Sequence, residues 1–329
     1  MLNIGILGCG RIGQVHALTI SRLDGVRVTS VADAVPAAAQ SLAARTGAQV
    51  MEAQALIDSP LVDAVVIATP TDSHYDQIHA AARAGKAIFC EKPVDMSADR
   101  IRDCIKVVEA AGVPFMTAFN RRFDPNFANL QARLRAGEIG QVELVSITSR
   151  DPAPPPVSYI ERSGGIFRDM MIHDLDMARF LLGEDVLQVF AVGSALVDPA
   201  IGAAGDIDTA AVTLTTASGA ICQITNSRRA TYGYDQRIEV HGALGMLQAG
   251  NVPETTVQLA NGSGFRAAPI QHFFLERYEA AYRAEVTLFA QCVAGRTPMT
   301  PGIHDGLAAQ VLADAAALSY STGQPVRIG

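Results

Sequence analysis

Three residues of this chain could together remove a proton from an alcohol: Lys92, Asp169 and His173. A carboxylate beside an imidazole stabilises the imidazolium that forms when histidine takes up a proton, and a nearby ammonium lowers the pKa of a bound hydroxyl. The trio therefore suits oxidation of a secondary alcohol near neutral pH. Each residue taken singly is more often structural, so this interpretation depends on the elements that carry them.

The local sequence predicts how these side chains are presented. Residues 164–182 read as one helix, and a spacing of four places Asp169 and His173 on the same helix face. Lys92 belongs to the run Glu91-Lys92-Pro93, directly after an apolar strand that ends at Cys90.

A nucleotide-binding pattern stands near the start of the chain. The run Gly8-Cys9-Gly10-Arg11-Ile12-Gly13 lies between an apolar stretch at residues 3–7 and a helical stretch at 14–18. In this setting Gly8 permits a tight turn, Gly10 lets the backbone approach a pyrophosphate, and Gly13 lets the helix pack on the strand. We expect the phosphates to bind at the N-terminus of that helix.

Asp33 indicates which dinucleotide binds. It ends a second strand, residues 26–32, at twenty positions beyond Gly13 (33 minus 13). An acidic residue there accepts hydrogen bonds from the adenosine ribose hydroxyls and repels a 2′-phosphate, which favours NAD over NADP.

Strand and helix patterns alternate through the first third of the chain. Strands are expected at 63–68, 87–90 and 113–119, and helices at 73–84 and 100–111. This alternation predicts a doubly wound parallel sheet, the Rossmann arrangement, whose ligands bind beyond the carboxyl ends of the strands. The residues that we assign to the cofactor on this basis are Gly8, Gly10, Arg11, Ile12, Gly13, Asp33, Thr69, Pro70, His74, Glu91 and Lys92.

The pattern changes in the second part of the chain, where strands follow one another. They are expected at 186–197, 209–216, 220–227, 236–240, 245–249 and 255–259. Glycine turns between them predict an α+β domain with a large, mostly antiparallel open sheet and helices on one face. Helices at 276–294 and 304–319 would complete this domain, and the other face of the sheet could pair subunits.

Length and composition fit two domains. A chain of 329 residues exceeds what one core usually supports, so we expect an NAD-binding domain at 1–120 and a substrate-binding and oligomerisation domain at 121–329. The formal charge of 26 minus 33, or −7, without a long basic run disfavours nucleic acid and anionic membranes as partners.

The five cysteines show no metal-ligand spacing, so we expect reduced thiols, no metal and a cytoplasmic location. The first residues lack a basic stretch of the kind that opens a signal peptide, and no apolar run reaches membrane-spanning length.

Several motifs together resemble one family. Gly8–Gly13, Ala68-Thr69-Pro70-Thr71, Glu91-Lys92-Pro93 and the Asp169 to Asp176 segment are similar to those of the glucose-fructose oxidoreductase/inositol dehydrogenase/rhizopine catabolism (Gfo/Idh/MocA) family. The resemblance covers essentially the whole chain, and residues 149–152, 163–174 and 226–235 look like its inositol dehydrogenase branch. It implies a homotetramer that uses NAD to oxidise myo-inositol, a polyol, to the 2-keto product.

The resemblance also implies roles for individual residues. Lys92 matches the family's active-site lysine, and Asp169 and His173 match its catalytic pair. His173 would act as the general base, Asp169 would fix its tautomer, and Lys92 would stabilise the developing alkoxide. The substrate contacts implied by the resemblance are Arg121, Asp151, Asp169, His173 and Tyr234.

Two alternatives remain open at this point. The same residues could oxidise another polyol or an aldose. A nucleotide-sensing regulator without turnover is a second possibility, but such a protein should lack the set Lys92, Asp169 and His173 that is present in this chain.

Overall fold

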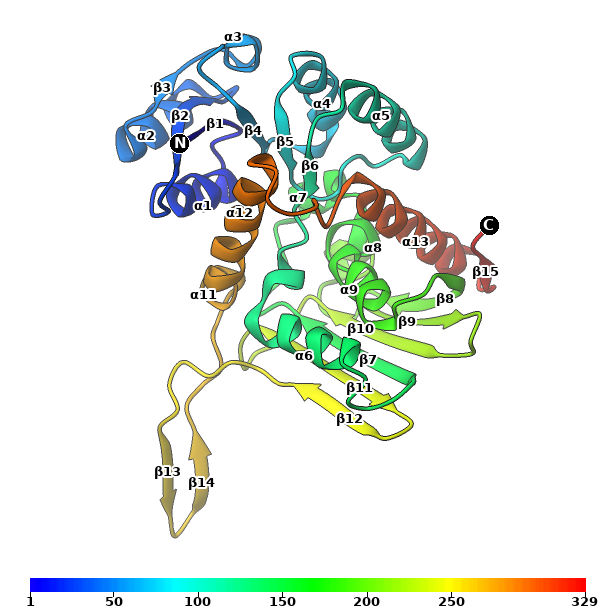
Figure 1. Cartoon of the computed structure of the whole chain (residues 1–329). Helices are drawn as coiled ribbons and strands as arrows, with labels where there is room; N and C mark the ends of the chain where they lie inside the picture. The colour runs from blue at the N-terminus through cyan, green and yellow to red at the C-terminus, as the bar shows by residue number, and fades with distance from the viewer. The chain divides into compact units, whose positions relative to one another are not determined.

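The computed structural model describes all 329 residues, Met1–Gly329, which fold into two compact units (Figure 1). Unit 1 comprises Met1–Phe123 and Ala280–Gln310, and unit 2 comprises Asp124–Glu279 and Val311–Gly329. None of the helices combines the length and the apolar composition that crossing a bilayer requires.

Unit 1 contains a six-stranded sheet in which every neighbouring pair is parallel, in the order β3-β2-β1-β4-β5-β6. Every residue of β4 and β5 is buried, because helices cover both faces of a parallel sheet. The predicted doubly wound sheet is thus confirmed. The strands are β1 Leu2–Leu7, β2 Val26–Ala32, β3 Gln49–Val50, β4 Ala64–Ile67, β5 Ala87–Cys90 and β6 Phe115–Thr117.

Helix α5 of unit 1 begins and ends at residues with capping roles. In α5, the side chain of Ser97 accepts a hydrogen bond from the Arg100 amide, and Gly112 ends the helix in the left-handed conformation at φ 63°. The helical segments are α1 Arg11–Ile20, α2 Pro36–Thr46, α3 Ala53–Asp58, η1 Thr71–Ser73, α4 His74–Arg83, α5 Ala98–Ala111, η2 Asn120–Phe123, α12 Glu279–Val293 and the first part of α13 Ile303–Thr322.

The two units differ from the division expected at residues 120 and 121, because Ala280–Gln310 returns to unit 1. Helix α12 buries Val286 and Phe289 in the same apolar core as β1 and β5. The rings of Phe289 and Phe89 meet edge to face with centroids 5.5 Å apart. Burial of this apolar surface explains why the helix belongs to unit 1. The sequence pattern at 276–294 predicts a helix but does not show which core the helix joins.

Unit 2 is built on a seven-stranded sheet in the order β12-β11-β7-β10-β9-β8-β15, where β7 and β10 pair in parallel and all other neighbours are antiparallel. This confirms the predicted mostly antiparallel sheet. Its strands are β7 Val142–Arg150, β8 Val186–Ser194, β9 Thr209–Thr216, β10 Ile221–Ser227, β11 Asp235–Gly242, β12 Gly245–Ala249 and β15 Val326–Arg327. Its helices are α6 Pro125–Arg135, α7 Val157–Ser163, α8 Gly165–Asp169, α9 Ile172–Leu182, α10 Pro199–Ala203, α11 Phe274–Arg277 and the rest of α13.

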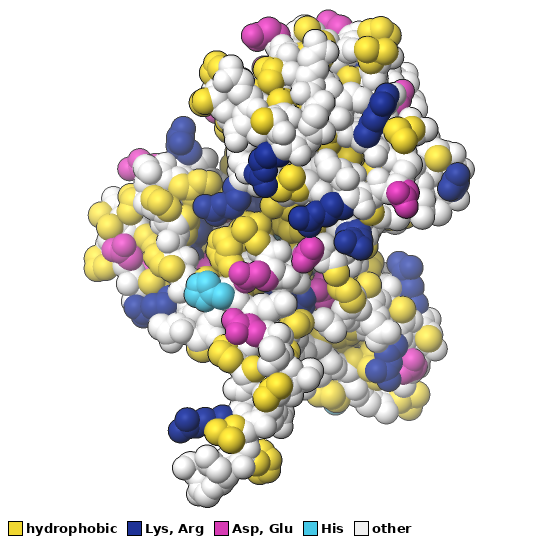
Figure 2. All heavy atoms as spheres, turned by 90° about the vertical axis from the view of Figure 1, so that its left-hand side faces the viewer, with side chains coloured by type: hydrophobic (Ala, Val, Ile, Leu, Met, Phe, Trp, Pro, Cys, Tyr) yellow, Lys and Arg dark blue, Asp and Glu magenta, His cyan; other side chains and the backbone are white.

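The strand expected at 255–259 is part of a separate hairpin, formed by β13 Gln258–Asn261 and β14 Gly264–Ala267. These two strands pair only with each other, and all of their residues are exposed. Figure 1 shows the hairpin projecting away from the seven-stranded sheet, and Figure 2 shows hydrophobic side chains on its surface. Phe265 is 83% exposed, so the strand pattern there does not come from core packing.

The prediction of one continuous helix over 164–182 is wrong. Helix α8 ends at Asp169 and α9 begins at Ile172. At the break, the amides of Met170 and Met171 both donate to the carbonyl of Ile166, and both methionine side chains are buried. The local turn therefore sets the relation between Asp169 and His173, which helical spacing alone does not describe.

Candidate active site

In unit 1, the predicted cofactor residues gather at the carboxyl ends of the central strands. The Gly8 amide donates to the carbonyl of Ala32 at the end of β2, and the Glu91 amide donates to the carbonyl of Ile67 at the end of β4. Ligands of open parallel sheets bind at this edge.

The three glycines of the Gly8–Gly13 turn have different physical reasons to be glycine. Gly8 has φ +93°, and a Cβ there would lie 2.5 Å from the carbonyl oxygen of Ala68. A Cβ on Gly13 would lie 1.9 Å from the carbonyl oxygen of Gly8, so helix α1 can approach the turn only without a side chain.

Gly10 differs from both. Its φ is −68°, which any residue adopts, and a Cβ there would have no atom within 4 Å. The fold therefore does not require glycine at position 10, whereas a pyrophosphate lying against this backbone does. The turn fits a dinucleotide. Arg11 is exposed and Ile12 half-buried at the start of α1, next to this open space.

Asp33 fastens the glycine turn to the end of β2. Its carboxylate accepts hydrogen bonds from the Cys9 amide at 2.6 Å and the Val35 amide at 2.7 Å. A carboxylate has further lone pairs for ribose hydroxyls. Burial, with a smaller effect of the Asp33 charge, raises the pKa of the Cys9 thiol to about 11, so this cysteine is protonated at neutral pH.

His74 joins two loops that carry predicted site residues. It is 1% exposed, and its ring nitrogens lie 3.0 Å from the carbonyl oxygens of Thr69 and Pro93. Burial lowers the pKa of His74 although these hydrogen bonds oppose the shift. Its position makes His74 a support for Thr69 and for the loop that contains Lys92. Pro70 is exposed, and Lys92 is half-buried.

Arg121 is the one predicted substrate contact in unit 1. It lies in η2, just after β6, and is 5% exposed. The expected domain division had placed this residue in the second domain.

In unit 2, Asp169 is held by two partners that the sequence reasoning did not identify. The hydroxyl of Tyr159 donates to one carboxylate oxygen at 2.8 Å, and Nη2 of Arg228 lies 3.3 Å from the other. The side chain of Arg228 is only 2% exposed, and it also lies 3.9 Å from Asp206. The contacts with Tyr159 and Arg228 fix the position of the Asp169 carboxyl group within unit 2.

Helix α9, which carries His173, is anchored to the sheet through the next residue along the chain. Asp174 is fully buried and accepts hydrogen bonds from Ser149 on β7 and from Asn226 on β10, the latter at 2.9 Å. The half-buried His173 therefore lies on a helix with a fixed position on its sheet.

The remaining predicted substrate contacts lie at the ends of neighbouring strands of this sheet. Asp151 follows β7, and its amide donates to the carbonyl of Ser227 on the parallel strand β10, next to Arg228. Tyr234 is 7% exposed and packs edge to face on Tyr278 with ring centroids 5.9 Å apart.

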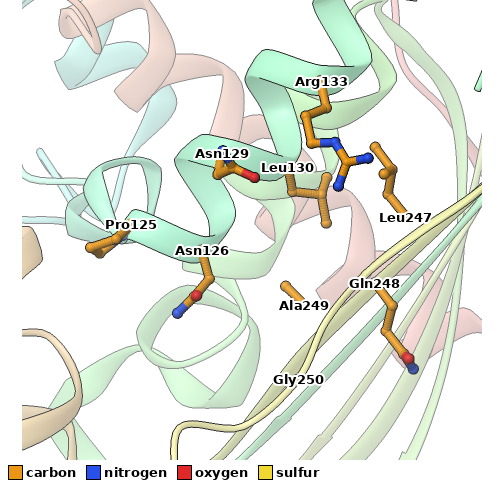
Figure 3. A pocket seen from close by; sticks show the side chains of 9 residues that line it. All are labelled: Pro125, Asn126, Asn129, Leu130, Arg133, Leu247, Gln248, Ala249 and Gly250. Carbon is orange, nitrogen blue, oxygen red and sulfur yellow. The ribbon is translucent and has the colours of Figure 1, made fainter. Parts of the chain in front are cut away.

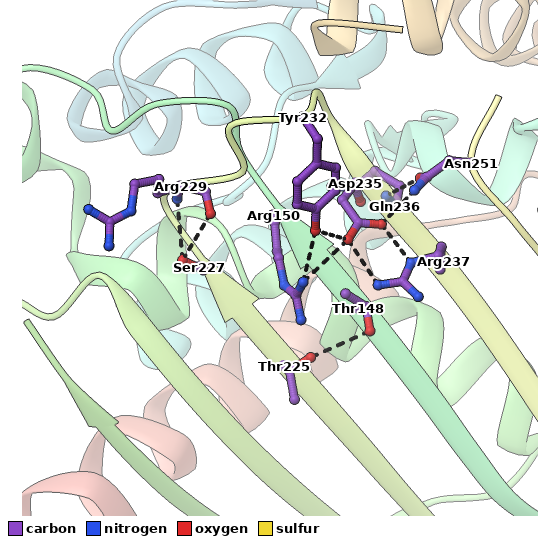
Figure 4. A network of polar contacts seen from close by, with 10 residues as sticks. All are labelled: Thr148, Arg150, Thr225, Ser227, Arg229, Tyr232, Asp235, Gln236, Arg237 and Asn251. Atoms are coloured by element: carbon purple, nitrogen blue, oxygen red, sulfur yellow. Dashed lines mark hydrogen bonds and ion pairs between the residues drawn. The ribbon is translucent and has the colours of Figure 1, made fainter. Parts of the chain in front are cut away.

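A polar network surrounds Asp235 at the start of β11 (Figure 4). Tyr232 donates to Asp235 at 2.6 Å and accepts from Arg150 at 2.8 Å. Burial acts to raise the pKa of Asp235, but hydrogen bonds from Arg237, Tyr232 and Asn251 outweigh it, so the pKa is lowered. This network orders the strand ends beside Asp151 and Tyr234.

A cavity of about 380 Å³ lies elsewhere in unit 2, between α6 and β12 (Figure 3). Asn126, Asn129 and Arg133 line one wall, and Leu247 and Gln248 line the other. None of the predicted site residues contributes to it, so we do not assign the reaction to this cavity.

The sheet order, the glycine turn and the acidic end of β2 define a dinucleotide-binding domain. Family models match the chain as "Oxidoreductase family, NAD-binding Rossmann fold" over residues 2–119 and as "GFO/IDH/MocA C-terminal domain" over residues 127–248. The chain belongs to the GFO/IDH/MocA family, which confirms the family, the fold class and NAD as predicted.

Individual relatives match over their full length. The chain is 51% identical over 327 residues to the inositol 2-dehydrogenase of Rhizobium meliloti strain 1021, covering 99% of each chain. Among solved structures, a myo-inositol dehydrogenase from Corynebacterium glutamicum ATCC 13032 is 42% identical with a TM-score of 0.95, covering 100% of this chain and 99% of that one. A scyllo-inositol dehydrogenase from Lactobacillus casei with bound NAD(H) and scyllo-inositol is 28% identical with a TM-score of 0.93, covering 99% of each chain.

Proposed function

We propose that this protein is an NAD-dependent inositol 2-dehydrogenase that oxidises myo-inositol to 2-keto-myo-inositol (scyllo-inosose). The observation that carries the proposal is the buried pairing of Arg228 with Asp169, four residues before His173, in a chain that belongs to an NAD-binding family. The substrate is supported by the full-length relatives named as inositol dehydrogenases.

The proposed roles follow from the chemistry of the side chains. His173 accepts the proton of the hydroxyl that is oxidised, and Asp169 stabilises the imidazolium that results. The contacts of Asp169 with Tyr159 and Arg228 hold its carboxylate in place. Lys92 stabilises the developing alkoxide by its charge. NAD, when bound, supplies the hydride acceptor.

Arg121, Asp151 and Tyr234 are the proposed substrate contacts. A polyol needs several short polar partners, because each buried polar group without one costs about 1–3 kcal/mol. Arg121 and Tyr234 are both less than one tenth exposed, so a hydroxyl bound to either would be shielded from water.

The proposal also covers the organisation of the protein. Residues 1–120 bind NAD, and the substrate contacts come mostly from residues 121–329, whose open sheet assembles the protein into a homotetramer in the cytoplasm. Five unpaired, buried cysteines suit a reducing compartment. Light scattering after gel filtration measures the assembly.

Scyllo-inositol is the second candidate substrate, favoured by the Lactobacillus casei structure that contains it. Initial rates of NAD reduction with myo-inositol, scyllo-inositol, glucose and xylose decide between the candidates. We expect the highest kcat/KM with myo-inositol. A higher value with scyllo-inositol replaces the proposed substrate, and a higher value with glucose or xylose makes the protein an aldose dehydrogenase.

A further inference from the structure

Three titratable side chains lie in the interior of unit 1: His16 on α1, Glu91 after β5 and Glu285 on α12. His16 contacts Glu91, and the charge of Glu91 affects the pKa of Glu285. His16 and Glu285 are fully buried, and Glu91 is 8% exposed. Burying charged or polar groups costs free energy unless they are paired, so such a cluster calls for a physical explanation.

The ring of His16 is fixed from two sides. It packs edge to face on Phe89 with centroids 4.9 Å apart, and on Tyr282 with centroids 5.7 Å apart. Its Nε2 lies 2.6 Å from Oε1 of Glu91. This is the distance of a strong, charge-assisted hydrogen bond, so His16 sets the orientation of the Glu91 carboxylate.

The second carboxylate oxygen of Glu91 contacts the backbone of Lys92. Oε2 of Glu91 accepts a hydrogen bond from the backbone amide of Lys92 at 3.3 Å. A continuous series of contacts therefore runs from helix α1, three residues after Gly13, through Glu91 to the main chain of Lys92.

Glu285 is the second buried carboxyl group of this cluster. Both of its carboxyl oxygens are buried without a hydrogen-bond partner. Burial, and then the charge of Glu91, raises the pKa of Glu285 well above its ordinary value. Two carboxyl groups in one buried environment resist being charged together, so Glu285 keeps its proton and the His16 imidazole is the side-chain partner of Glu91.

We infer that His16 is a positioning residue for Lys92: it holds the Glu91 carboxylate, which in turn holds the backbone of Lys92 at the end of β5. Without the imidazole, the Glu91 carboxylate loses the contact that fixes its orientation and leaves the Lys92 amide. This inference rests on the proposed role of Lys92 in the dehydrogenase reaction.

The test compares variants of the full-length protein. His16→Leu removes the hydrogen-bond donor to Glu91. If that variant does not fold, His16→Asn replaces it, because the asparagine side chain is too short to reach Glu91. His16→Gln restores an N–H donor at nearly the position of Nε2. The matched control is His79→Leu, because His79 is a buried histidine of the same unit that pairs with Asp103 at 3.5 Å and lies on α4.

For His16→Leu or His16→Asn we expect kcat with the best substrate to fall about 10- to 100-fold, as misplacement of a catalytic group by about 1 Å does. The Kd for NAD should stay within about threefold, because the glycine turn and Asp33 are unchanged. His16→Gln should recover most of kcat. Equal losses of kcat in His16→Leu and His79→Leu, or a loss that appears only in the Kd for NAD, would overturn the inference.

A second measurement is independent of turnover. The sequence contains three lysines, Lys86, Lys92 and Lys106. Acetylation by acetic anhydride, followed by mass spectrometry, gives the rate at Lys92 relative to the exposed Lys106. In His16→Leu this ratio should change by at least about threefold, and in His79→Leu it should not.

The two measurements separate the possible failures. If the wild-type protein oxidises none of the four polyols and sugars, the proposed function fails, while the labelling ratio still tests the link from His16 to Lys92. If the ratio is the same in all variants, the positioning role of His16 is refuted whether or not the protein is a dehydrogenase.

Discussion

Arg228 and Asp169 form an ion pair within unit 2, with Nη2 of the arginine 3.3 Å from the carboxylate and its side chain only 2% exposed. A buried charge that loses its partner destabilises a protein by about 3–5 kcal/mol. Arg228 therefore has two effects: it stabilises unit 2, and it holds the Asp169 carboxylate that the proposed reaction needs.

Replacing Arg228 with methionine should lower the free energy of unfolding by about this amount and reduce kcat per folded molecule. Arg229→Met is the control, because Arg229 is the exposed neighbour. Urea unfolding and initial rates measure both effects. Unchanged kcat in folded Arg228→Met would show that Asp169 does not need this partner for catalysis.

His173→Ala tests the general base. We expect kcat to fall by about 10²–10⁴-fold, the usual contribution of a positioned base, with the Kd for NAD unchanged because His173 belongs to unit 2. The exposed His241 offers a control variant, His241→Ala, which should behave as the wild type. Full activity of His173→Ala would end its assignment as the base.

Two glycine variants separate cofactor binding from folding. Gly10→Ala adds a Cβ in open space, so Tm should stay the same while the Kd for NAD rises at least about tenfold. Gly13→Ala places a Cβ 1.9 Å from the Gly8 carbonyl oxygen, so Tm itself should fall. Thermal melts and NAD titrations distinguish the two. Wild-type affinity in Gly10→Ala would place the pyrophosphate elsewhere.

The double variant Asp33→Ser with Ala34→Arg should shift the preference from NAD towards NADP. It removes the carboxylate that repels a 2′-phosphate and adds a cation that binds one. Serine can still accept from the Cys9 amide, the contact that Asp33 makes in the wild type. The ratio of kcat/KM for the two cofactors is the measurement. A wild-type protein that already uses both equally well contradicts the role of Asp33.

Glu285→Gln should stabilise the protein increasingly as the pH rises. Burial and the charge of Glu91 raise the pKa of Glu285, so the folded chain keeps a proton that the unfolded chain releases above its ordinary pKa of 4.5. The contribution of protonated Glu285 to the free energy of unfolding is therefore fully present below pH 4.5 and is lost progressively as the pH rises above it. The Tm difference between variant and wild type should therefore be larger at pH 8 than at pH 5, and a constant difference would contradict a buried, protonated Glu285.

Local patterns were sufficient for much of the fold and for the position of the glycine turn. The Gly8–Gly13 turn, Asp33 and the buried β4 and β5 all lie where their sequence signals placed them. Those signals are local: a strand buried on both faces is apolar throughout, and a tight turn before a helix needs glycine.

The segment that contains Asp169 and His173 shows what local patterns could not predict. Spacing of four suggested one helix for Asp169 and His173, whereas two methionine amides that share the Ile166 carbonyl divide it into α8 and α9. Burial of side chains at the break is a tertiary effect. The spacing of residues in the sequence does not reveal where it interrupts the regular hydrogen bonds of a helix.

By itself, therefore, the sequence determined the parallel sheet and the nucleotide-binding turn, because short-range steric and polar requirements encode both. The resemblance of its motifs indicated the family and NAD, and Lys92, Asp169 and His173 stay the predicted reactive groups. Only the tertiary structure decided their partners. Arg228 meets Asp169 across 59 residues and His16 meets Glu91 across 75. Such pairs form when the chain folds around a common core, where the loss of water makes each buried charge depend on a partner from a distant segment.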